Sequence, residues 1–220
     1  MKKLSKIIVI IAFLGLCSCG PSNEEKAQQM AAEYLKGELY HFDSYEPIQI
    51  KIDSSFVSLT SDKEAISLTQ EIIHLCQSLQ EYAQNIEMAE SSMDIWTPDA
   101  YSLYSHGEYM RAKNERDKNQ RLLNKTVDRI QTLIEKIKAR QSDIKEGDFK
   151  GWKVYHKFKS LNGEGSMALF GEFIFFCDKD FNLEFAYSKE DMDAISKVIE
   201  AVLSSDNLHE FGEQLQESYL

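Results

Sequence analysis

Acidic and amide side chains that could bind calcium follow an apolar run late in the chain. Asp178, Asp180 and Asn182 have the D-x-D-x-N spacing that opens an EF-hand loop. An EF-hand also needs Gly at its sixth position to bend the loop and Glu at its twelfth to close the site. Here those positions hold Leu183 and Lys189. The segment is therefore predicted to be a β-turn and not a calcium site.

The histidines offer no zinc site either. None lies within helical or hairpin ligand spacing of another: His41, His74, His106, His156 and His209. His156 shares a predicted strand face with Trp152, Val154 and Phe158, and His74 lies between Ile73 and Leu75, so both are predicted to be core or half-buried side chains. The chain also contains no G-x-S-x-G, P-loop or G-x-G-x-x-G motif. We expect no metal, no cofactor and no enzymatic activity.

Aromatic residues indicate two alternative binding surfaces. The first lies where two long helical segments turn, and it includes four candidate partner contacts: Trp96, Tyr101, Tyr104 and Tyr109. Trp and Tyr are common anchors at protein interfaces; the alternative is that these residues pack against the rest of the chain. The second surface is one face of a curved sheet, where a small ligand would be lined by Trp152, Tyr155, Phe173 and Phe175.

Two apolar seams at heptad spacing must position the first surface. Apolar residues recur in steps of three and four along residues 72–93, and a second seam follows along residues 123–144. Between the seams, Thr97-Pro98 and Ser105-His106-Gly107 interrupt the pattern, and Ile95 and Leu103 lie among the aromatic residues. The two helices are therefore predicted to fold back as an antiparallel hairpin.

The remaining segments alternate at period two or carry helix signals. Strands are predicted at residues 45–59, 152–159, 167–176 and 183–187. A capping box at Ser22 begins a helix over about 23–39, and another helix follows Ser188. The predicted fold class is α+β, with a small antiparallel sheet packed with the N- and C-terminal helices and the long helical hairpin inserted after the first strand.

The first residues have the pattern of an export signal. Three lysines precede an apolar run over residues 7–16, which is too short to span a bilayer because that needs about 20 residues. Leu16-Cys17-Ser18-Cys19 resembles a bacterial lipobox. The resemblance implies cleavage before Cys19 and acyl chains such as palmitate on that residue; ordinary secretory cleavage elsewhere is the alternative. Two or three acyl chains would hold the protein firmly on a membrane.

The net charge and the predicted export narrow the classes of partner and the state of the cysteines. The chain has 25 Lys plus Arg against 36 Asp plus Glu, a net charge of −11. Such a surface repels phosphate backbones, so nucleic-acid binding is not expected. Cys76 and Cys177 would meet an oxidising compartment and could form a disulfide, or remain buried free thiols.

These predictions divide the chain into five segments. They are a signal peptide at 1–18, a first helix and strand at 19–60, the hairpin at 61–146, a β-meander and helix at 147–204, and a loosely docked acidic tail at 205–220.

Four short motifs around the two ends carry a family resemblance. They are Asp43-Ser44-Tyr45-Glu46-Pro47, Tyr155-His156-Lys157-Phe158-Lys159, Asn162-Gly163-x-Gly165 and Phe175-Phe176-Cys177-Asp178. They resemble segments of small hypothetical lipoproteins of Gram-negative gut anaerobes. The resemblance implies the same order of helix, strand, variable helical insert and meander, but no established activity. We therefore expect an envelope lipoprotein, anchored to the outer membrane on its periplasmic or surface face, that binds an envelope protein or serves as a scaffold; the alternative is a small-ligand-binding module.

Overall fold

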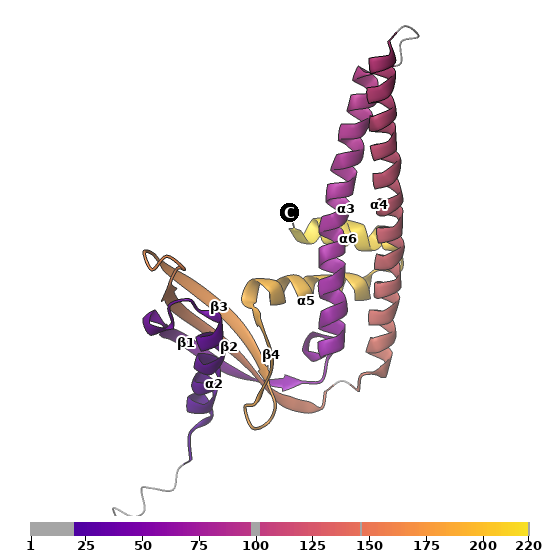
Figure 1. The fold of residues 1–220 in the computed structure, drawn as a ribbon. Helices are drawn as coiled ribbons and strands as arrows, with labels where there is room; N and C mark the ends of the chain where they lie inside the picture. Colours follow the sequence, from indigo (N-terminus) through magenta and orange to yellow (C-terminus); the bar gives the residue numbers. More distant parts are fainter. Residues whose placement is uncertain (1–19, 98–101, 146, 220) are drawn as a thin grey trace, which may run out of the picture. The chain divides into compact units, whose positions relative to one another are not determined.

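The fold is α+β, as predicted, and the computed structural model describes residues 20–97, 102–145 and 147–219 (Figure 1). The chain forms two compact units, which are described separately. The sheet unit comprises residues 1–56 and 149–190, and the hairpin unit comprises residues 57–148 and 191–220.

The sheet unit contains four antiparallel strands in the order β1-β2-β3-β4. Their bounds are β1 Glu46–Phe56, β2 Phe149–Leu161, β3 Ala168–Cys177 and β4 Leu183–Ser188. In the register, Val154 on β2 lies between Ile52 on β1 and Phe175 on β3. Because side chains alternate along a strand, these three residues share one face of the sheet.

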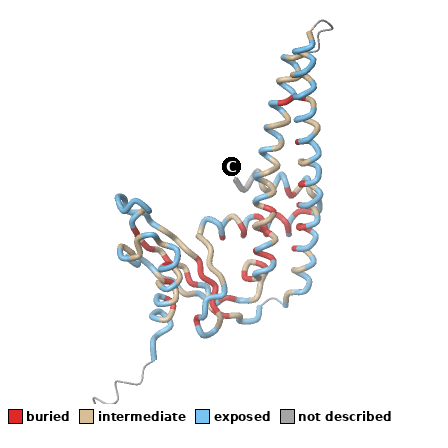
Figure 2. The backbone as a smooth tube through the Cα atoms, in the orientation of Figure 1, coloured by how far each residue is buried: buried red, intermediate tan, exposed pale blue. Residues whose placement is uncertain are grey.

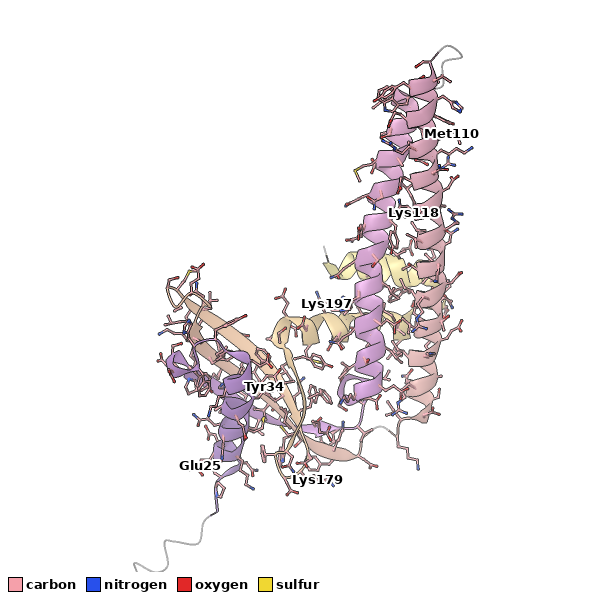
Figure 3. All side chains as sticks on the ribbon, viewed as in Figure 1. Glu25, Tyr34, Met110, Lys118, Lys179 and Lys197 are labelled. Carbon is pink, nitrogen blue, oxygen red and sulfur yellow. The ribbon has the colours of Figure 1, made fainter. Side chains whose placement is uncertain are left out.

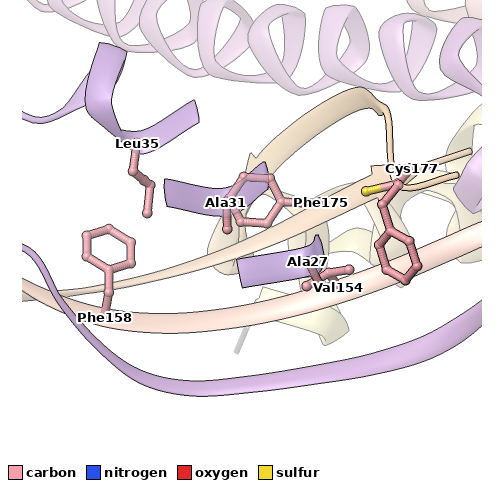
Figure 4. Packing of buried hydrophobic residues seen from close by; sticks show 8 residues of the cluster. Ala27, Ala31, Leu35, Val154, Phe158, Phe175 and Cys177 are labelled. Carbon is pink, nitrogen blue, oxygen red and sulfur yellow. The ribbon is translucent and has the colours of Figure 1, made fainter. Parts of the chain in front are cut away.

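Helix α2 (Asn23–Glu38) covers that face. Ser22 and Glu25 form the predicted capping box at its start. The fully buried Ala27, Ala31 and Leu35 repeat every four residues and so form one stripe. This stripe packs against the apolar side chains of β2 and β3, Val154, Phe158, Phe175 and Cys177 (Figure 4).

Two strand glycines allow close packing in this unit. A Cβ atom on Gly151 would lie 2.0 Å from the carbonyl oxygen of Cys177, and one on Gly171 would lie 2.3 Å from Phe158 Cζ. Neither position has room for a side chain, so both glycines are required by their surroundings.

The hairpin unit is built on α3 (Lys63–Ile95) and α4 (Leu103–Asp143). The apolar residues that make up the two predicted seams are all buried or half-buried, with Ile72, Ile130 and Ile137 among the most buried. The seam residues are Ile72, Leu75, Leu79, Tyr82, Ile86, Ala89 and Met93 in the first seam, and Leu123, Val127, Ile130, Ile134, Ile137 and Ile144 in the second. Asp62 caps α3 by accepting a hydrogen bond from Ala65 N at 2.9 Å. Arg140 on α4 donates to both carboxylate oxygens of Asp62, at 3.1 and 2.8 Å. The antiparallel hairpin is therefore confirmed.

The C-terminal helices belong to the hairpin unit, whereas the sequence predicted that the helix after Ser188 packs on the sheet. The unit includes α5 (Lys189–Ser204) from Asp191 onward, and α6 (Leu208–Tyr219). Lys138 Nζ on α4 donates to the carbonyl oxygen of Ser205, at the end of α5. In Figure 2, buried residues gather in the part of the hairpin beside α5 and α6, and the far part is mostly exposed or half-buried.

The prediction of a loosely docked tail over 205–220 was wrong. Glu210 N donates to Asn207 Oδ1 at 3.0 Å and starts α6. Phe211 is buried, and Leu208 and Leu215 stand three residues before and four residues after it. The helical spacing was present but was obscured by the acidic residues between.

Candidate interaction surface at the end of the hairpin

Both helices are capped at the ends that adjoin the residues between α3 and α4. The Trp96 N–H donates to the carbonyl oxygen of Ser92 at 3.0 Å and ends α3. Ser102 Oγ accepts a hydrogen bond from Ser105 N at 3.2 Å and starts α4. These caps fix the first and last turns, so side chains on them have defined positions.

Large apolar side chains are exposed on these turns. The exposed fraction is 94% for Leu103, 74% for Ile95 and 67% for Tyr104. Trp96 is half-buried and packs edge-on against the Tyr104 ring, with 5.5 Å between ring centroids. Ile95, Trp96, Leu103 and Tyr104 together are called the hairpin end below.

Two of the four predicted partner contacts, Trp96 and Tyr104, therefore touch each other. Tyr109 is half-buried on α4, one turn or more from Tyr104. Tyr101 lies outside the described residues. The sequence did not single out Met88 and Met110, which are also exposed on the far part of the hairpin; Met110 is labelled in Figure 3.

A shallow groove of about 400 Å³ continues from the hairpin end along both helices. Trp96 and Met88 line it from α3, and its buried members are Ala89, Ala112 and Asn119. Charged side chains of α4 complete the lining: Glu108, Arg111, Glu115 and Lys118. The mixture of apolar and charged groups is typical of a protein-binding surface rather than of an enclosed ligand pocket.

Charges beside the groove are paired with their neighbours. Arg116 Nε and Nη2 both donate to Asp117 Oδ1, at 3.0 and 2.5 Å. This hydrogen bond is the largest cause lowering the pKa of Asp117 and raising the pKa of Arg116. Both groups are thus ionised at neutral pH.

The predicted ligand-lining residues of the sheet do not share a face. Phe175 is fully buried, Trp152 and Phe173 pack against the same core, and Tyr34 of α2 lies over the Phe173 and Phe175 rings with centroids 5.9 and 5.4 Å away. Tyr155 follows Val154 on β2 and so points to the opposite face. The interpretation as one lining was wrong, because residues 152 and 155 differ in parity on a single strand.

Tyr155 is instead part of a polar group on the other sheet face. Lys157 Nζ donates to Glu172 Oε1 at 2.7 Å, and Lys51 Nζ lies 6.0 Å from the Tyr155 ring centroid. Burial raises the pKa of Tyr155, and its hydrogen bond with Glu172 raises it further. The hydrogen bonds from Lys157 and Tyr155 lower the pKa of Glu172.

His156 is a core residue, as predicted. It is fully buried, with Nε2 2.7 Å from the Tyr45 hydroxyl and Nδ1 3.2 Å from the carbonyl oxygen of Gln49. Burial lowers its pKa, so a neutral ring that donates from Nδ1 and accepts at Nε2 satisfies both contacts. The same prediction for His74 was wrong, because that residue is exposed on α3. Its sequence neighbours lie about 100° away on a helix and do not set its environment.

The Asp178 segment is a turn, as predicted. Asp178 Oδ1 accepts hydrogen bonds from the backbone N–H groups of Asp180 and Asn182, at 2.8 and 2.9 Å, and Oδ2 accepts from Asn182 Nδ2 at 2.7 Å. These bonds, with those from Asn182 the largest cause, lower the pKa of Asp178. The carboxylate thus holds the turn.

Both described cysteines are free thiols. Burial raises the pKa of Cys177 to about 12, and the charge of Asp178 adds to the effect. Burial also raises the pKa of Cys76. The two thiols belong to different units, and each is protonated at neutral pH.

Across residues 20–97, 102–145 and 147–219, no group of three or more His, Cys, Asp or Glu side chains is arranged to hold a metal ion. None of the helices within these ranges combines the length and hydrophobicity that a bilayer-spanning helix needs. No protein-family model matches the chain, and no significant match is found among curated proteins or solved structures.

Proposed function

We propose that this chain is a lipid-anchored envelope protein that binds another protein through the hairpin end. The observation that carries the proposal is the exposure of Ile95, Leu103 and Tyr104 at one end of a long helical pair. Exposed apolar clusters rimmed by charges are typical of interaction sites. The occupant we favour is an envelope protein with an apolar surface of its own.

The local geometry supports partner binding. Trp96 is held edge-on against Tyr104, and both flanking helix ends are capped. Aromatic anchors that are already positioned lose little conformational entropy when a partner covers them. The groove below the hairpin end would receive the edge of the same partner.

The lipid anchor rests on the lipobox resemblance of Leu16–Cys19, which lies outside the described residues. We propose acylation of Cys19 and attachment to the outer membrane. We also infer a non-enzymatic role, because side chains suited to chemistry serve the fold. His156 is hydrogen-bonded in the core, Asp178 holds a turn, and burial keeps the Cys177 thiol protonated.

A small-ligand site on the sheet is less well supported. Three of its four predicted lining residues, Trp152, Phe173 and Phe175, pack in the core beneath α2. A ligand at that face would have to displace the helix, so partner binding at the hairpin end is preferred.

Site-specific photo-crosslinking tests the interaction. A photoreactive amino acid is placed at Tyr104 in the full-length chain in a Gram-negative host, and the matched control places it at Tyr40, which is 89% exposed in the sheet unit. We expect a discrete crosslinked protein from position 104 only, lost when Ile95 and Leu103 are replaced by Ser. The same products from both positions, or none from 104, would contradict the proposal.

The anchor is tested separately on the wild-type chain and Cys19→Ala. Mass spectrometry of the mature N-terminus should find acyl chains on Cys19. The variant should leave the membrane fraction. An unmodified N-terminus at another residue would show ordinary secretory cleavage instead.

A further inference from the structure

A row of aromatic rings crosses one end of the sheet unit. It runs from Phe181 in the β3–β4 turn through Trp152 and Phe149 on β2 to Phe56 at the end of β1. The ring centroids are 5.4, 5.3 and 6.3 Å apart along the row. These four residues are called the aromatic end below, and the sequence did not single them out as a group.

The row begins in the core and ends in solvent. Phe181 is buried and belongs to the same cluster as Ala27, in the first turns of α2. Phe149 and Phe56 at the other end of the row are 37% and 50% exposed. The core of the sheet unit therefore continues past α2, and its last two rings are partly exposed.

The turn that carries Phe181 is held in place by its own hydrogen bonds. Phe181 has φ +68°, which is uncommon for a residue other than glycine. The bonds that Asp178 accepts from residues 180 and 182 fix this backbone. Trp152 Nε1 then donates to the carbonyl oxygen of Lys179 at 3.1 Å, which fixes the indole against the turn.

A cation accompanies the exposed rings. Lys179 Nζ lies 5.7 Å from the centroid of the Phe149 ring. Aromatic rings beside a lysine ammonium are the combination that side chains use at the boundary between lipid headgroups and acyl chains.

The aromatic end lies beside the start of α2. A groove of about 430 Å³ is lined by Lys26 and Met30 of α2 together with Phe181 and Leu183. In Figure 3, Glu25 in the first turn of α2 and Lys179 lie toward the same end of the sheet unit, whereas Tyr34 lies farther along. The rings thus gather at the end from which the chain leads back to Cys19.

Chain length then places this end near any lipid on Cys19. Helix α2 begins at Asn23, four residues after Cys19. Four extended residues span at most about 14 Å. We propose that the aromatic end lies in the interfacial layer of the bilayer to which Cys19 is attached, with Phe56 and Phe149 inserted among the lipids. This inference rests on the proposed lipid anchor.

The proposed contact with the bilayer depends on apolar side chains rather than on charge. Glu24 and Glu25 lie at the start of α2 beside Lys26, so the charges near the aromatic end are mixed in sign. Anionic lipids should therefore add little, and the contact should persist when salt is raised.

Fluorescence quenching in vesicles tests the inference on the full-length chain isolated with its lipid. Trp96→Phe leaves Trp152 as the only tryptophan, since the chain has two. The protein is reconstituted in phosphatidylcholine vesicles with or without bromine on the upper acyl-chain carbons. Since interfacial side chains sit about 5–10 Å deep, we expect brominated vesicles to quench Trp152 emission about twofold.

Two matched variants in the same background locate the contact. Phe56→Ser with Phe149→Ser should abolish the quenching while the protein still floats with the vesicles. Tyr40→Ser removes an aromatic residue that is 89% exposed and follows the far end of α2, and it should leave the quenching unchanged. A second reporter, Phe149→Trp with Trp96→Phe and Trp152→Phe, repeats the measurement on an exposed ring.

The outcomes separate this inference from the proposed anchor. Flotation with no quenching would overturn the membrane contact and leave the anchor in place. Quenching that survives removal of Phe56 and Phe149, or crosslinks between copies at these residues, would also overturn it. A wild-type chain that does not float would overturn both proposals.

Discussion

The aromatic cluster beneath α2 and the aromatic pair at the hairpin end are used in opposite ways. In the sheet unit, Phe158, Phe173 and Phe175 contact one another beneath α2. In the hairpin unit, Trp96 and Tyr104 contact each other at the end of a helical pair, where Tyr104 is mostly exposed. A sheet covered by a helix surrounds a side chain on several sides, whereas a two-helix seam can cover only the residues that face it. We infer that the rings beneath α2 stabilise the fold, whereas the rings of the hairpin end are left for a partner.

The sharpest way to break this comparison is to truncate one ring in each unit. Phe175→Ala removes a fully buried ring and should lower the free energy of unfolding by about 3–5 kcal/mol. Tyr104→Ala should change it by less than about 0.5 kcal/mol, because the ring is mainly exposed. Urea unfolding followed by circular dichroism measures both. A loss at Tyr104 as large as that at Phe175 would mean that the hairpin end is a core.

A pair of glycines tests the same contrast through the backbone. Gly151→Ala would place a Cβ atom 2.0 Å from the carbonyl oxygen of Cys177, so β2 and β3 must shift and the protein should lose about 1–3 kcal/mol. Gly107→Ala meets nothing within 4 Å on α4 and should gain about 0.5–1 kcal/mol from helix propensity. Thermal unfolding of the two variants would show shifts of opposite sign. If Gly151→Ala shifted the melting temperature no more than Gly107→Ala, the space around Gly151 would have to accept a Cβ atom without strain.

Periodicity explains which elements could be predicted from the sequence. The heptad seams and the strands were predicted because each pattern reports which side of one element is buried. Packing between elements has no such signal. The grouping of α5 and α6 with the hairpin depends on contacts between segments distant in sequence, such as that of Lys138 with Ser205.

The candidate sites were predicted less well, for the same reason. Residue type identified Trp96 and Tyr104 as surface aromatics but grouped Tyr155 wrongly with Trp152, which parity along β2 excludes. The aromatic end could not be predicted from the sequence, because its four rings come from β1, β2 and a turn. Only the folded sheet brings them together.

The pH dependence of stability tests how far the sheet unit relies on its buried residues. Burial lowers the pKa of His156 in the folded state, so the unfolded chain takes up the proton first as the pH falls. The stability that the neutral ring provides should be complete above about pH 6.5 and be lost below it, by at most about 1.36 kcal/mol per pH unit for one group. Urea midpoints between pH 5 and 8 would measure the slope.

Two variants test whether His156 causes this change of stability with pH. His156→Gln should remove it between pH 5 and 6.5, a range above that of the carboxyl groups with lowered pKa, such as Glu172 and Asp178. Tyr45→Phe deletes the 2.7 Å hydrogen bond to Nε2 and should lower stability while a pH slope remains. An unchanged slope in His156→Gln would assign the titration to another group.

The smallest expected effect concerns how the hairpin is held near its start. Asp62 and Glu71 each pair with an arginine of α4, at 2.8 Å to Arg140 and 2.7 Å to Arg129. Asp62 also caps α3, so Asp62→Ala should cost about 1 kcal/mol from the lost cap. Glu71→Gln removes only an exposed ion pair and should cost less than about 0.5 kcal/mol. Equal losses in urea unfolding would mean that the cap of α3 adds nothing beyond the ion pairs between the two helices, and that ion pairs rather than the cap hold the start of the hairpin.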